Sequence, residues 1–365
     1  MYPHTINDLL TAMVGAAASD LHLVVGSPPY IRLHGGLEPL VEEKLTVGAA
    51  EELILAIMNE RERERLSDKR EVDFAYSLPG VSRFRVNACY QRDSLTAVMR
   101  AIPANPPELE SMGLSPLVAQ MTQRPRGLVL VTGPTGSGKS TTLAAMINFI
   151  NRHKHVRVVT IEDPIEFLHQ NVNSVITQRE VGRDTLSFDN ALRSALRQDP
   201  DVILVGEMRD LETISLALTA AETGHLVFAT LHVTSAPESI NRMVDVFPPE
   251  QQEQIRFQLS GVLEAVFTQA LLPRADGAGR ACAMEILLGT HAVRNLIREN
   301  KPSQMLTAMQ TGQSVGMQTL ERALSSLIAE GAITLDAALE ATSHPDELKR
   351  MAAEPAPKAR FASSF

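Results

Sequence analysis

Residues 128–142, LVLVTGPTGSGKSTT, decide the fold of this chain. The apolar run 128–131 predicts a buried strand, and residues 133–140 match the phosphate-binding loop pattern G-x-x-x-x-G-K-[ST] at every fixed position. The loop is therefore expected between a strand and an amphipathic helix. Beyond the loop, the apolar residues that recur with helical spacing are Leu143, Met146, Ile147 and Ile150.

The composition of the loop explains how it would bind a phosphate. Its glycines let the backbone curl so that successive N–H groups point at one anion, and the start of the helix adds the positive end of its dipole. Lys139 is expected to reach the β- and γ-phosphates of ATP, and Ser140 to hold Mg²⁺ through its hydroxyl. A glycine-rich turn with a solvated lysine is the alternative, which the complete match disfavours. The predicted nucleotide-binding residues are Gly133, Pro134, Thr135, Gly136, Ser137, Gly138, Lys139, Ser140 and Thr141.

Length and composition limit the class of protein. The chain has 365 residues, which corresponds to two or three domains, and 44% of them are hydrophobic, enough for a sizeable core. It carries 34 Lys and Arg against 43 Asp and Glu, a net charge of −9, whereas nucleic-acid binders usually show a basic excess. Two cysteines, Cys89 and Cys282, are too few and too far apart for a disulfide framework or a Cys-rich zinc site.

The sequence shows neither a signal peptide nor a transmembrane segment. The N-terminal residues MYPHTINDLL lack the pattern of a signal peptide, and no apolar run approaches the ~18 residues of a membrane span. We therefore expect a cytoplasmic protein that would act at a membrane only through partners.

Residues 1–102 predict a small α+β domain. In RFRVNACYQR (83–92) apolar and polar side chains alternate, so one face of the sheet is expected to be polar. Three prolines follow within five residues, and they predict an interdomain linker at 103–115. The predicted helices cover 5–17 and 48–66, and the predicted strands cover 21–25, 30–34, 71–77, 83–92 and 95–102.

Strands and helices alternate in residues 116–350, which predicts α/β architecture. A largely parallel, doubly wound sheet would present the phosphate loop at the carboxyl end of a strand. A hairpin is expected around the turn 275–279, helices over 291–344, and disorder in the tail 351–365. The predicted strands are 128–132, 157–161, 202–205 and 226–231, and the predicted helices are 140–152, 188–198 and 211–223.

Acidic residues follow two of these strands at the edge where the phosphate site would lie. Glu162, Asp163 and Glu166 come after the second strand, and DVILVGE resembles a Walker B strand in which Gly206 and Glu207 replace the usual aspartate. A carboxylate there can hold Mg²⁺ or orient the attacking water. Glu207 is the first choice for the acid at the metal and water, and Glu166 is the rival for general base. An acidic surface cluster is the alternative for the first three residues.

Two histidines bracket the strand predicted at 226–231. Because side chains alternate along a strand, His225 and His232 would face opposite sides and could not easily bind one metal. Sensing of the γ-phosphate or of the subunit junction is the functional interpretation, and a buried or capping histidine is the alternative. Arg193 and Arg197 lie one turn apart on a predicted helix, which is typical of a solvated face.

Four blocks in order resemble one family: GPTGSGKST, TIEDPIEF, DPDVILVGEMRD and TAAETGHLVFATLH are similar to the secretion-superfamily ATPases that drive type IV pili and type II secretion. The likeness covers about residues 4–345. Pilus extension and type II secretion ATPases are usually longer and many carry a four-cysteine zinc motif, which argues against them, whereas a close paralogue would share the core motifs. Stretches similar to the pilus retraction (twitching motility) branch are ASDLHLVVGSPPYIRLHG (18–35), RFRVN (83–87), MRAIP (99–103), AVRNLIREN (292–300) and GMQTLE (316–321).

The resemblance implies a RecA-like P-loop ATPase domain with a smaller N-terminal PAS-like α+β domain. It implies a homohexamer that acts on an inner-membrane pilus platform protein, with ATP and Mg²⁺ as cofactors and Ser140 and Glu207 at the metal. Arg85 and Arg100 would reach the nucleotide from the N-terminal domain, with surface arginines as the alternative. The other implied residues are Glu162, Asp163 and Glu166 in an aspartate box, Gly206 and Glu207 at the Walker B end, and His225 and His232 in a histidine box.

Three other functions compete with pilus retraction. A paralogous pilus or type II secretion assembly ATPase would share the motor motifs. A RecA-like nucleic-acid motor is disfavoured by the net charge of −9 and by the lack of a basic-aromatic segment. A module that binds ATP without hydrolysing it is disfavoured by the presence of both Glu166 and Glu207.

Overall fold

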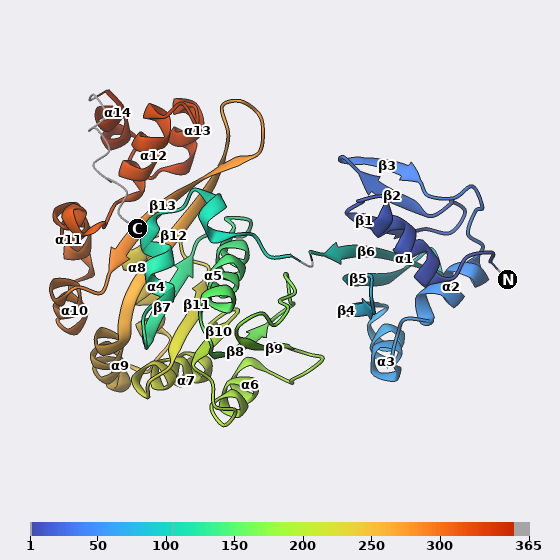
Figure 1. Ribbon diagram of the computed structural model, residues 1–365, viewed down its shortest axis with the longest axis horizontal. Helices are drawn as coiled ribbons and strands as arrows, with labels where there is room; N and C mark the ends of the chain where they lie inside the picture. Colours follow the sequence, from blue (N-terminus) through green and yellow to red (C-terminus); the bar gives the residue numbers. More distant parts are fainter. Residues whose placement is uncertain (1, 104, 354–365) are drawn as a thin grey trace. The chain divides into compact units, whose positions relative to one another are not determined.

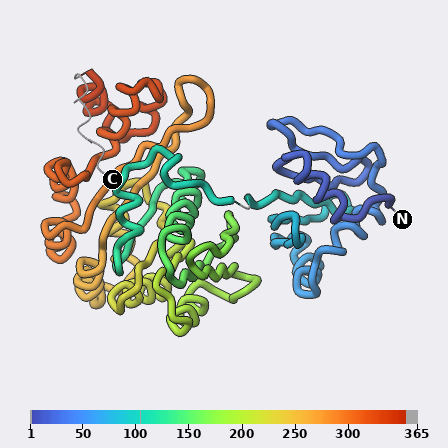
Figure 2. The backbone as a smooth tube through the Cα atoms, in the orientation of Figure 1, coloured from blue at the N-terminus to red at the C-terminus, as the bar shows by residue number. Residues whose placement is uncertain are grey.

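The computed structural model describes residues 2–103 and 105–353, and these residues form two compact units. The first unit contains the residues up to Pro106 together with the short segment Pro164–His169. The second unit contains Pro107–Asp163 and the chain from Gln170 onwards. Figure 1 labels the helices and strands of both units, and Figure 2 traces their backbone.

A six-stranded antiparallel sheet forms the N-terminal unit, with the strand order β3-β2-β1-β6-β5-β4. Its core lies between the sheet and the helices, where Leu10, Met13 and Phe84 are fully buried. The elements are α1 (Ile6–Gly15), β1 (Asp20–Leu23), β2 (Tyr30–Leu33), β3 (Gly36–Pro39), α2 (Val47–Leu55), α3 (Glu60–Lys69), β4 (Glu71–Leu78), β5 (Ser82–Gln91) and β6 (Ser94–Ile102).

The alternation predicted along β5 is confirmed, because Phe84 and Val86 are buried while Arg85 and Asn87 are exposed. The single helix predicted at 48–66 is wrong. Asn59 breaks it, because its side chain accepts the N–H of Glu62 and starts a new helix, α3, with a capping box. Strand β3 was not predicted, since all its residues are exposed and it lacks an apolar face.

A seven-stranded sheet forms the centre of the C-terminal unit, in the order β13-β12-β7-β11-β10-β8-β9. All neighbours are parallel except the β12–β13 pair, so the predicted doubly wound sheet is confirmed. The elements up to β11 are η1 (Leu109–Met112), α4 (Pro116–Thr122), β7 (Gly127–Thr132), α5 (Lys139–His153), β8 (Arg157–Glu162), β9 (Val175–Glu180), α6 (Phe188–Ala195), β10 (Val202–Val205), α7 (Leu211–Glu222) and β11 (Leu226–Leu231).

The rest of the C-terminal unit contains the β12–β13 hairpin and helices on either side of it in sequence. The predicted hairpin is present, and the region predicted as helical over 291–344 is divided into short helices and turns. These elements are α8 (Ala236–Asp245), α9 (Pro249–Val262), β12 (Leu263–Pro273), β13 (Arg280–Leu288), α10 (His291–Arg298), η2 (Pro302–Gln304), α11 (Met305–Thr311), η3 (Gly312–Val315), α12 (Leu320–Ala329), α13 (Leu335–Ala341) and α14 (Pro345–Ala353).

Several elements of this unit were not predicted. Strand β9 carries polar residues along an exposed edge, and α4, α8 and α9 begin at or next to prolines that were not interpreted as helix starts. The 3₁₀ turn η1 lies inside the segment 103–115 that was expected to be irregular. Of the tail 351–365, predicted to be disordered, residues 351–353 end α14 and the remainder lies outside the described residues.

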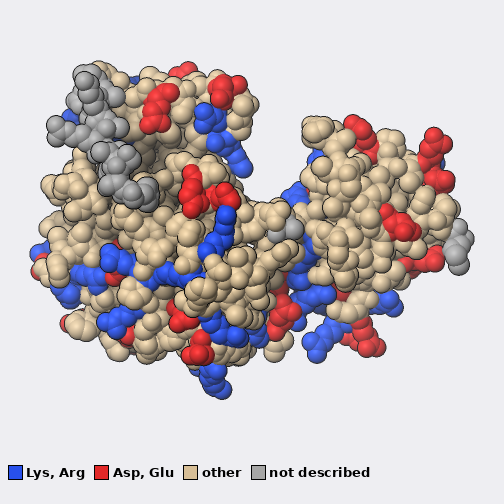
Figure 3. Space-filling model, in the orientation of Figure 1, with Lys and Arg blue, Asp and Glu red and all other residues tan. Residues whose placement is uncertain are grey.

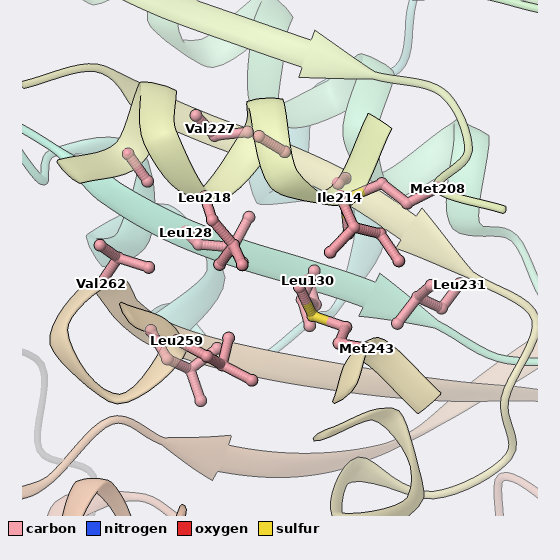
Figure 4. Packing of buried hydrophobic residues seen from close by; sticks show 14 of the residues in the cluster. Leu128, Leu130, Met208, Ile214, Leu218, Val227, Leu231, Met243, Leu259 and Val262 are labelled. Atoms are coloured by element: carbon pink, nitrogen blue, oxygen red, sulfur yellow. The ribbon is translucent and has the colours of Figure 1, made fainter. Parts of the chain in front are cut away.

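The central strands are covered on both faces, which holds the phosphate loop between two packed layers. Leu128 and Leu130 of β7 point to one face and pack against Leu218 and its neighbours on α7, as Figure 4 shows. The intervening Val129 and Val131 point to the other face, where they pack with residues of α5. Because every residue of β7 is buried, the strand before the loop has little freedom to move.

The described residues also lack some features that other classes of protein require. In residues 2–103 and 105–353 no helix is both long and apolar enough to cross a membrane. Within the same residues no group of three or more His, Cys, Asp and Glu side chains is arranged to hold a metal ion. Cys89 and Cys282 are free thiols, each partly exposed.

Candidate active site

The phosphate-binding loop joins the end of β7 to the start of α5. Gly133 adopts a positive φ of 139°, and a Cβ there would lie 2.5 Å from the carbonyl oxygen of Gln269 and 2.6 Å from Ser137 Oγ. Only glycine therefore fits at this position. Gly138 is the N-cap residue of α5 and brings no side chain to its first N–H groups. The open helix start is suited to an anion.

Lys139 places its ammonium group inside the loop. Its side chain is buried, with 8% of the residue exposed, and Nζ donates hydrogen bonds to the carbonyl oxygens of Gly133 (2.8 Å) and Pro134 (3.0 Å). The ammonium group also lies 3.5 Å from Nδ1 of His232. A buried cation beside a helix N-terminus attracts negative charge, so this loop has the chemistry of a phosphate site.

Glu207 follows β10, and its carboxylate lies next to His232, which in turn lies next to the ammonium group of Lys139. The side chain of Glu207 is 19% exposed, and it contacts Nε of Arg209 at 2.5 Å and Nε2 of His232 at 3.4 Å. Burial raises the pKa of Glu207, but the hydrogen bond and the charge of Arg209, together with the hydrogen bond from His232, outweigh burial and hold the pKa below its usual value. Glu207 is therefore a carboxylate at neutral pH.

One imidazole connects the loop lysine to the Walker B glutamate. His232 follows β11, and its two ring nitrogens face Lys139 and Glu207 respectively. A neutral ring with its proton on Nε2 satisfies both contacts, because Nδ1 then accepts from the ammonium group and Nε2 donates to the carboxylate. A phosphate that drew Lys139 away from His232 would thereby change the hydrogen bond between His232 and Glu207.

Close packing explains why a glycine, Gly206, precedes Glu207. A Cβ at Gly206 would lie 3.0 Å from the carbonyl oxygen of Ile161 and 3.2 Å from Cα of Glu162, so a larger residue would crowd the neighbouring strand β8. The carbonyl of Gly206 accepts a hydrogen bond from Thr230 on β11. These contacts fix the direction in which Glu207 leaves the sheet.

The three acids after β8 have different surroundings. Glu162 accepts hydrogen bonds from Thr160 Oγ1 at 2.6 Å and from Gln178 Nε2 at 3.1 Å, so its carboxylate is oriented by two strands. Asp163 is exposed and raises the pKa of Arg209, after the larger effect of Glu207. Glu166 is exposed and lies in the segment Pro164–His169, which belongs to the N-terminal unit.

The two histidines lie at opposite ends of β11. His232 is at the carboxyl end beside the loop, whereas His225 precedes the strand and its Nδ1 is 2.9 Å from the carbonyl oxygen of Ala220. Six strand residues separate them, which is about 20 Å at the rise of a strand. Within one chain the structure therefore does not bring His225 to the phosphate loop.

Arg85 and Arg100 lie directly opposite each other on β5 and β6 of the N-terminal unit. Arg100 donates from Nε to Oδ1 of Asp20 at 2.8 Å. Burial raises the pKa of Asp20, but hydrogen bonds from Ser19 and Arg100 outweigh it and keep the pKa below its usual value. Like charges opposite each other destabilise a sheet, so the exposed Arg85 opposes a cation that already serves as the partner of Asp20.

Some residues around the site were not predicted as site residues. Arg209 is the ion-pair partner of Glu207 and stood two residues after it in the block GEMRD. Arg280 at the start of β13 donates from Nη1 to the carbonyl oxygen of Gly136 at 3.3 Å, and Gln269 of β12 donates to Thr142 Oγ1 at 2.8 Å. No local pattern could reveal the last two, because the β12–β13 hairpin is far from the loop in sequence.

A cavity of about 260 Å³ adjoins the loop. Two buried oxygens in its wall, Ser137 Oγ and Gln269 Oε1, have no hydrogen-bond partner among residues 2–103 and 105–353. The lining comes from the loop (134–137), Thr234, strand β12 (268–271), Leu320 and Ala341. The start of α12 and the end of α13 therefore border the same space as the phosphate loop.

Comparison with known proteins identifies the family of the chain. Residues 2–340 match the family described as type II/IV secretion system protein. The chain is 52% identical over 341 residues to the type IV pilus retraction ATPase PilT of Pseudomonas aeruginosa, covering 93% of this chain and 99% of that protein. It is 52% identical over 310 residues to a twitching motility protein of Neisseria gonorrhoeae, covering 85% and 83%. Among solved structures it resembles the pilus retraction motor PilT with bound ADP, with a TM-score of 0.88 and 47% identity over 95% of this chain and 99% of that one.

Proposed function

Because the chain belongs to the type II/IV secretion system protein family, we propose that it works as a hexameric, Mg²⁺-dependent motor in which ATP hydrolysis powers the retraction of type IV pili. The chain is an ATP hydrolase of the pilus retraction type, and its fold is a RecA-like ATPase domain with a smaller N-terminal domain. The observation that carries the catalytic part of the proposal is His232, which lies within 3.5 Å of both Lys139 and Glu207.

The residues of the loop would hold the triphosphate. Lys139 would turn from the carbonyl oxygens of Gly133 and Pro134 to the β- and γ-phosphates, and the N–H groups at the start of α5 would bind the same anion. Loss of two carbonyl contacts is offset by a charge-assisted contact with phosphate. The other loop residues, Thr135, Gly136, Ser137, Gly138, Ser140 and Thr141, would line the phosphates.

Glu207 would orient the attacking water. His232, which contacts both Lys139 and Glu207, would make the hydrogen bonding of Glu207 depend on whether Lys139 binds a γ-phosphate. The low pKa of Glu207 keeps it ionised, which suits a group that accepts a hydrogen bond from water. Glu166 stays the rival for general base, since the sequence alone does not rank the two acids. Glu162 and Asp163 would complete the acidic edge.

The hydroxyl of Ser140 and the carboxylate of Glu207 are oxygen donors of the kind that Mg²⁺ prefers, so the residues present fit this ion. When bound, Mg²⁺ would neutralise charge on the β- and γ-phosphates. Glu207 would thus both bind the ion and orient the attacking water.

Residues that lie away from the phosphate loop support an assembly of several subunits. Arg85 and Arg100 would reach the nucleotide as cations, which would explain two like charges on one exposed sheet face. His225 lies about 20 Å from His232 by strand rise, at the end of β11 away from the loop, so any contact between His225 and nucleotide would come from a neighbouring subunit. A homohexamer at the cytoplasmic face of the inner membrane, acting on the pilus platform protein, would combine these features.

Nucleic acid is disfavoured as a partner. The net charge is −9, and acidic side chains lie among the basic ones on the face shown in Figure 3. Single-stranded DNA should leave the ATPase rate unchanged, whereas stimulation by DNA would favour a nucleic-acid motor.

The experiment that tests the function replaces Lys139 by alanine in cells that retract pili with this protein as their retraction motor. ATP hydrolysis by the purified variant and the retraction speed of labelled pili should both be lost, because the phosphates lose their buried cation. Lys69→Ala on the exposed side of α3 is the matched control and should leave both unchanged. Normal retraction in Lys139→Ala cells would contradict the proposal.

A second experiment tests the assembly. Light scattering of the purified protein with ATP and Mg²⁺ should give about six times the chain mass of 39.8 kDa. A monomer at concentrations that support hydrolysis would rule out the ring.

A further inference from the structure

Glu285 is a buried carboxylate that the proposed reaction does not use. It lies on β13, opposite Thr268 of β12, and only 6% of the residue is exposed. Its Oε1 accepts the N–H of Ala236 at 2.5 Å, and it also accepts the N–H of Leu320. Ala236 and Leu320 are the first residues of α8 and α12. One carboxylate thus satisfies an N–H group at the start of each of two helices, where the helix dipoles favour negative charge.

The first of these helices begins close to the catalytic residues. Three residues separate His232 from Ala236, and Thr234, which lines the cavity beside the loop, is one of them. Ser239 in the first turn of α8 donates to Oγ1 of Thr132 at 3.4 Å, at the end of β7. The short segment that carries His232 is therefore held at its far end by Glu285.

The second helix belongs to the C-terminal group of helices. Gln318, just before α12, pairs with Ile286 through two backbone hydrogen bonds of 2.9 and 3.1 Å, which brings Leu320 next to Glu285. Leu320 itself borders the cavity beside the loop. Movement of α12 would therefore change the hydrogen bond between Leu320 and Glu285.

A second buried acid lies beside the first. Glu321 of α12 is 4% exposed and accepts a hydrogen bond from Thr342 Oγ1 at 2.8 Å. Burial, followed by the charge of Glu321, raises the pKa of Glu285 to about 7, although the N–H groups of Ala236 and Leu320 and the charge of His344 act in the opposite direction. Both protonation states of Glu285 are thus accessible near neutral pH.

We propose that Glu285 is a positioning residue that fixes the His232 segment through Ala236 and links its position to the C-terminal helices through Leu320. In the ionised form the carboxylate accepts both N–H groups. Protonation removes the negative charge and turns one oxygen into a donor and a weaker acceptor, so the hold on the two helix starts weakens. This inference rests on the proposed role of His232 at Lys139 and Glu207.

The test compares Glu285→Gln, Glu321→Gln and the exposed control Glu238→Gln in the full-length protein. Steady-state kcat and KM for ATP are measured between about pH 6 and about pH 9, with thermal unfolding in parallel. Glu285→Gln should lower kcat by about tenfold at high pH and leave KM within about twofold, since the amide directs an NH₂ group at a helix N–H while the phosphate contacts are untouched. Glu238→Gln, in the first turn of α8, should behave like the wild type.

The pH profile separates positioning from simple support of the fold. Wild-type kcat should fall below about pH 7 as Glu285 takes up a proton. Glu321→Gln should move this fall to lower pH, because it removes the neighbouring negative charge but keeps an acceptor for Thr342. Glu285→Gln should remove this contribution to the profile.

Two results would overturn the inference. The first is a Glu285→Gln variant with wild-type kcat and pH profile, and the second is an equal loss of kcat and ATP affinity with a lower melting temperature. If Glu285→Gln does not fold, an unshifted profile in Glu321→Gln decides against the inference. His232→Ala distinguishes this failure from that of the proposed function: wild-type activity in His232→Ala contradicts the proposed function, whereas an inactive His232→Ala beside a normal Glu285→Gln contradicts only the role of Glu285.

Discussion

Glu207 combines a nearly buried carboxylate with two basic neighbours, and this combination sets its protonation state. Burial alone would favour the neutral acid, which could not accept hydrogen bonds through both oxygens. Arg209, whose side chain is 73% exposed, and His232 reverse that preference. The exposed arginine therefore acts on the reaction through the carboxylate it contacts, although no pattern in the sequence marked it.

Replacing Arg209 by alanine should raise the pKa of Glu207, because it removes both a hydrogen bond and a positive charge that lower that pKa. The ratio of variant to wild-type kcat should then fall as the pH is lowered from about 7 to about 5, since a larger share of Glu207 becomes protonated. The ratio removes the contribution to the pH dependence of kcat from groups that titrate alike in both proteins. Arg197→Ala, at an exposed position after α6, should give a constant ratio. A constant ratio for Arg209→Ala as well would show that the ion pair does not control Glu207.

At the scale of elements, α10 shows how one residue of a family signature serves the packing of helices. Arg294 donates hydrogen bonds to the carbonyl oxygens of Gly289 (2.7 Å), Ser260 (3.1 Å) and Gly261, and to Glu264 at 2.8 Å. It thereby caps the last turn of α9 and joins it to β12. Of the two arginines of α10, Arg294 is a partly buried capping residue, whereas Arg298 is exposed.

Arg294→Ala should lower the free energy of unfolding by about 2 kcal/mol, because it leaves carbonyl groups and the carboxylate of Glu264 without their donor. Arg298→Ala is the matched control on the same helix. Its contacts with Ser260 Oγ at 3.5 Å and Asn295 Oδ1 at 3.0 Å are weaker, so its cost should stay below about 1 kcal/mol. Urea denaturation followed by circular dichroism measures both values. Equal costs would mean that the capping contacts of Arg294 add nothing.

Helix α7 depends on apolar packing rather than on caps alone. Leu218 is fully buried against the face of β7 that carries Leu128 and Leu130. Leu218→Ala should cost about 3 kcal/mol of unfolding free energy, the sum of lost burial and a residual cavity between α7 and β7. Leu335→Ala on α13, where the side chain is 40% exposed, should cost less than about 1 kcal/mol by the same measurement. A small loss for Leu218→Ala would show that the layer can collapse around the gap.

For the whole molecule, the buried acid Glu285 links stability to pH. Its pKa in the folded protein is about 7, above the ordinary 4.5. A carboxyl group with a raised pKa stabilises the fold fully below its unfolded pKa, and this contribution is lost as the pH rises through the folded pKa. Wild-type unfolding free energy should therefore fall, relative to Glu285→Gln, by up to about 3 kcal/mol between about pH 4.5 and about pH 7.

The same measurement has an internal control in Glu321→Gln. Removing the neighbouring negative charge lowers the pKa of Glu285, so the pH-dependent loss should become smaller and move to lower pH. Denaturation at a series of pH values, compared pairwise with the wild type, gives these differences. A pH-independent difference between the wild type and Glu285→Gln would contradict the raised pKa.

Much of the motor fold could be predicted because its signals are local. The strand, loop and helix at 128–152 are specified by apolar runs, glycines and helical spacing within one stretch of chain. The acids after β8 and β10 lie at one edge of the sheet because neighbouring parallel strands end there. Strand β9 and helices α8 and α9 were missed, since polar edge residues and proline starts give weak periodic signals.

Residues 128–142 alone predicted a P-loop ATPase, because the groups that bind phosphate are consecutive in the chain, whereas the pilus retraction type rested on the likeness to known ATPases. Which groups lie around that loop became known only from the folded chain. His232 reaches both Lys139 and Glu207, and Glu285 reaches the start of α8 from 49 residues away. Such contacts depend on how strands and helices are stacked, which no local spacing of residues specifies.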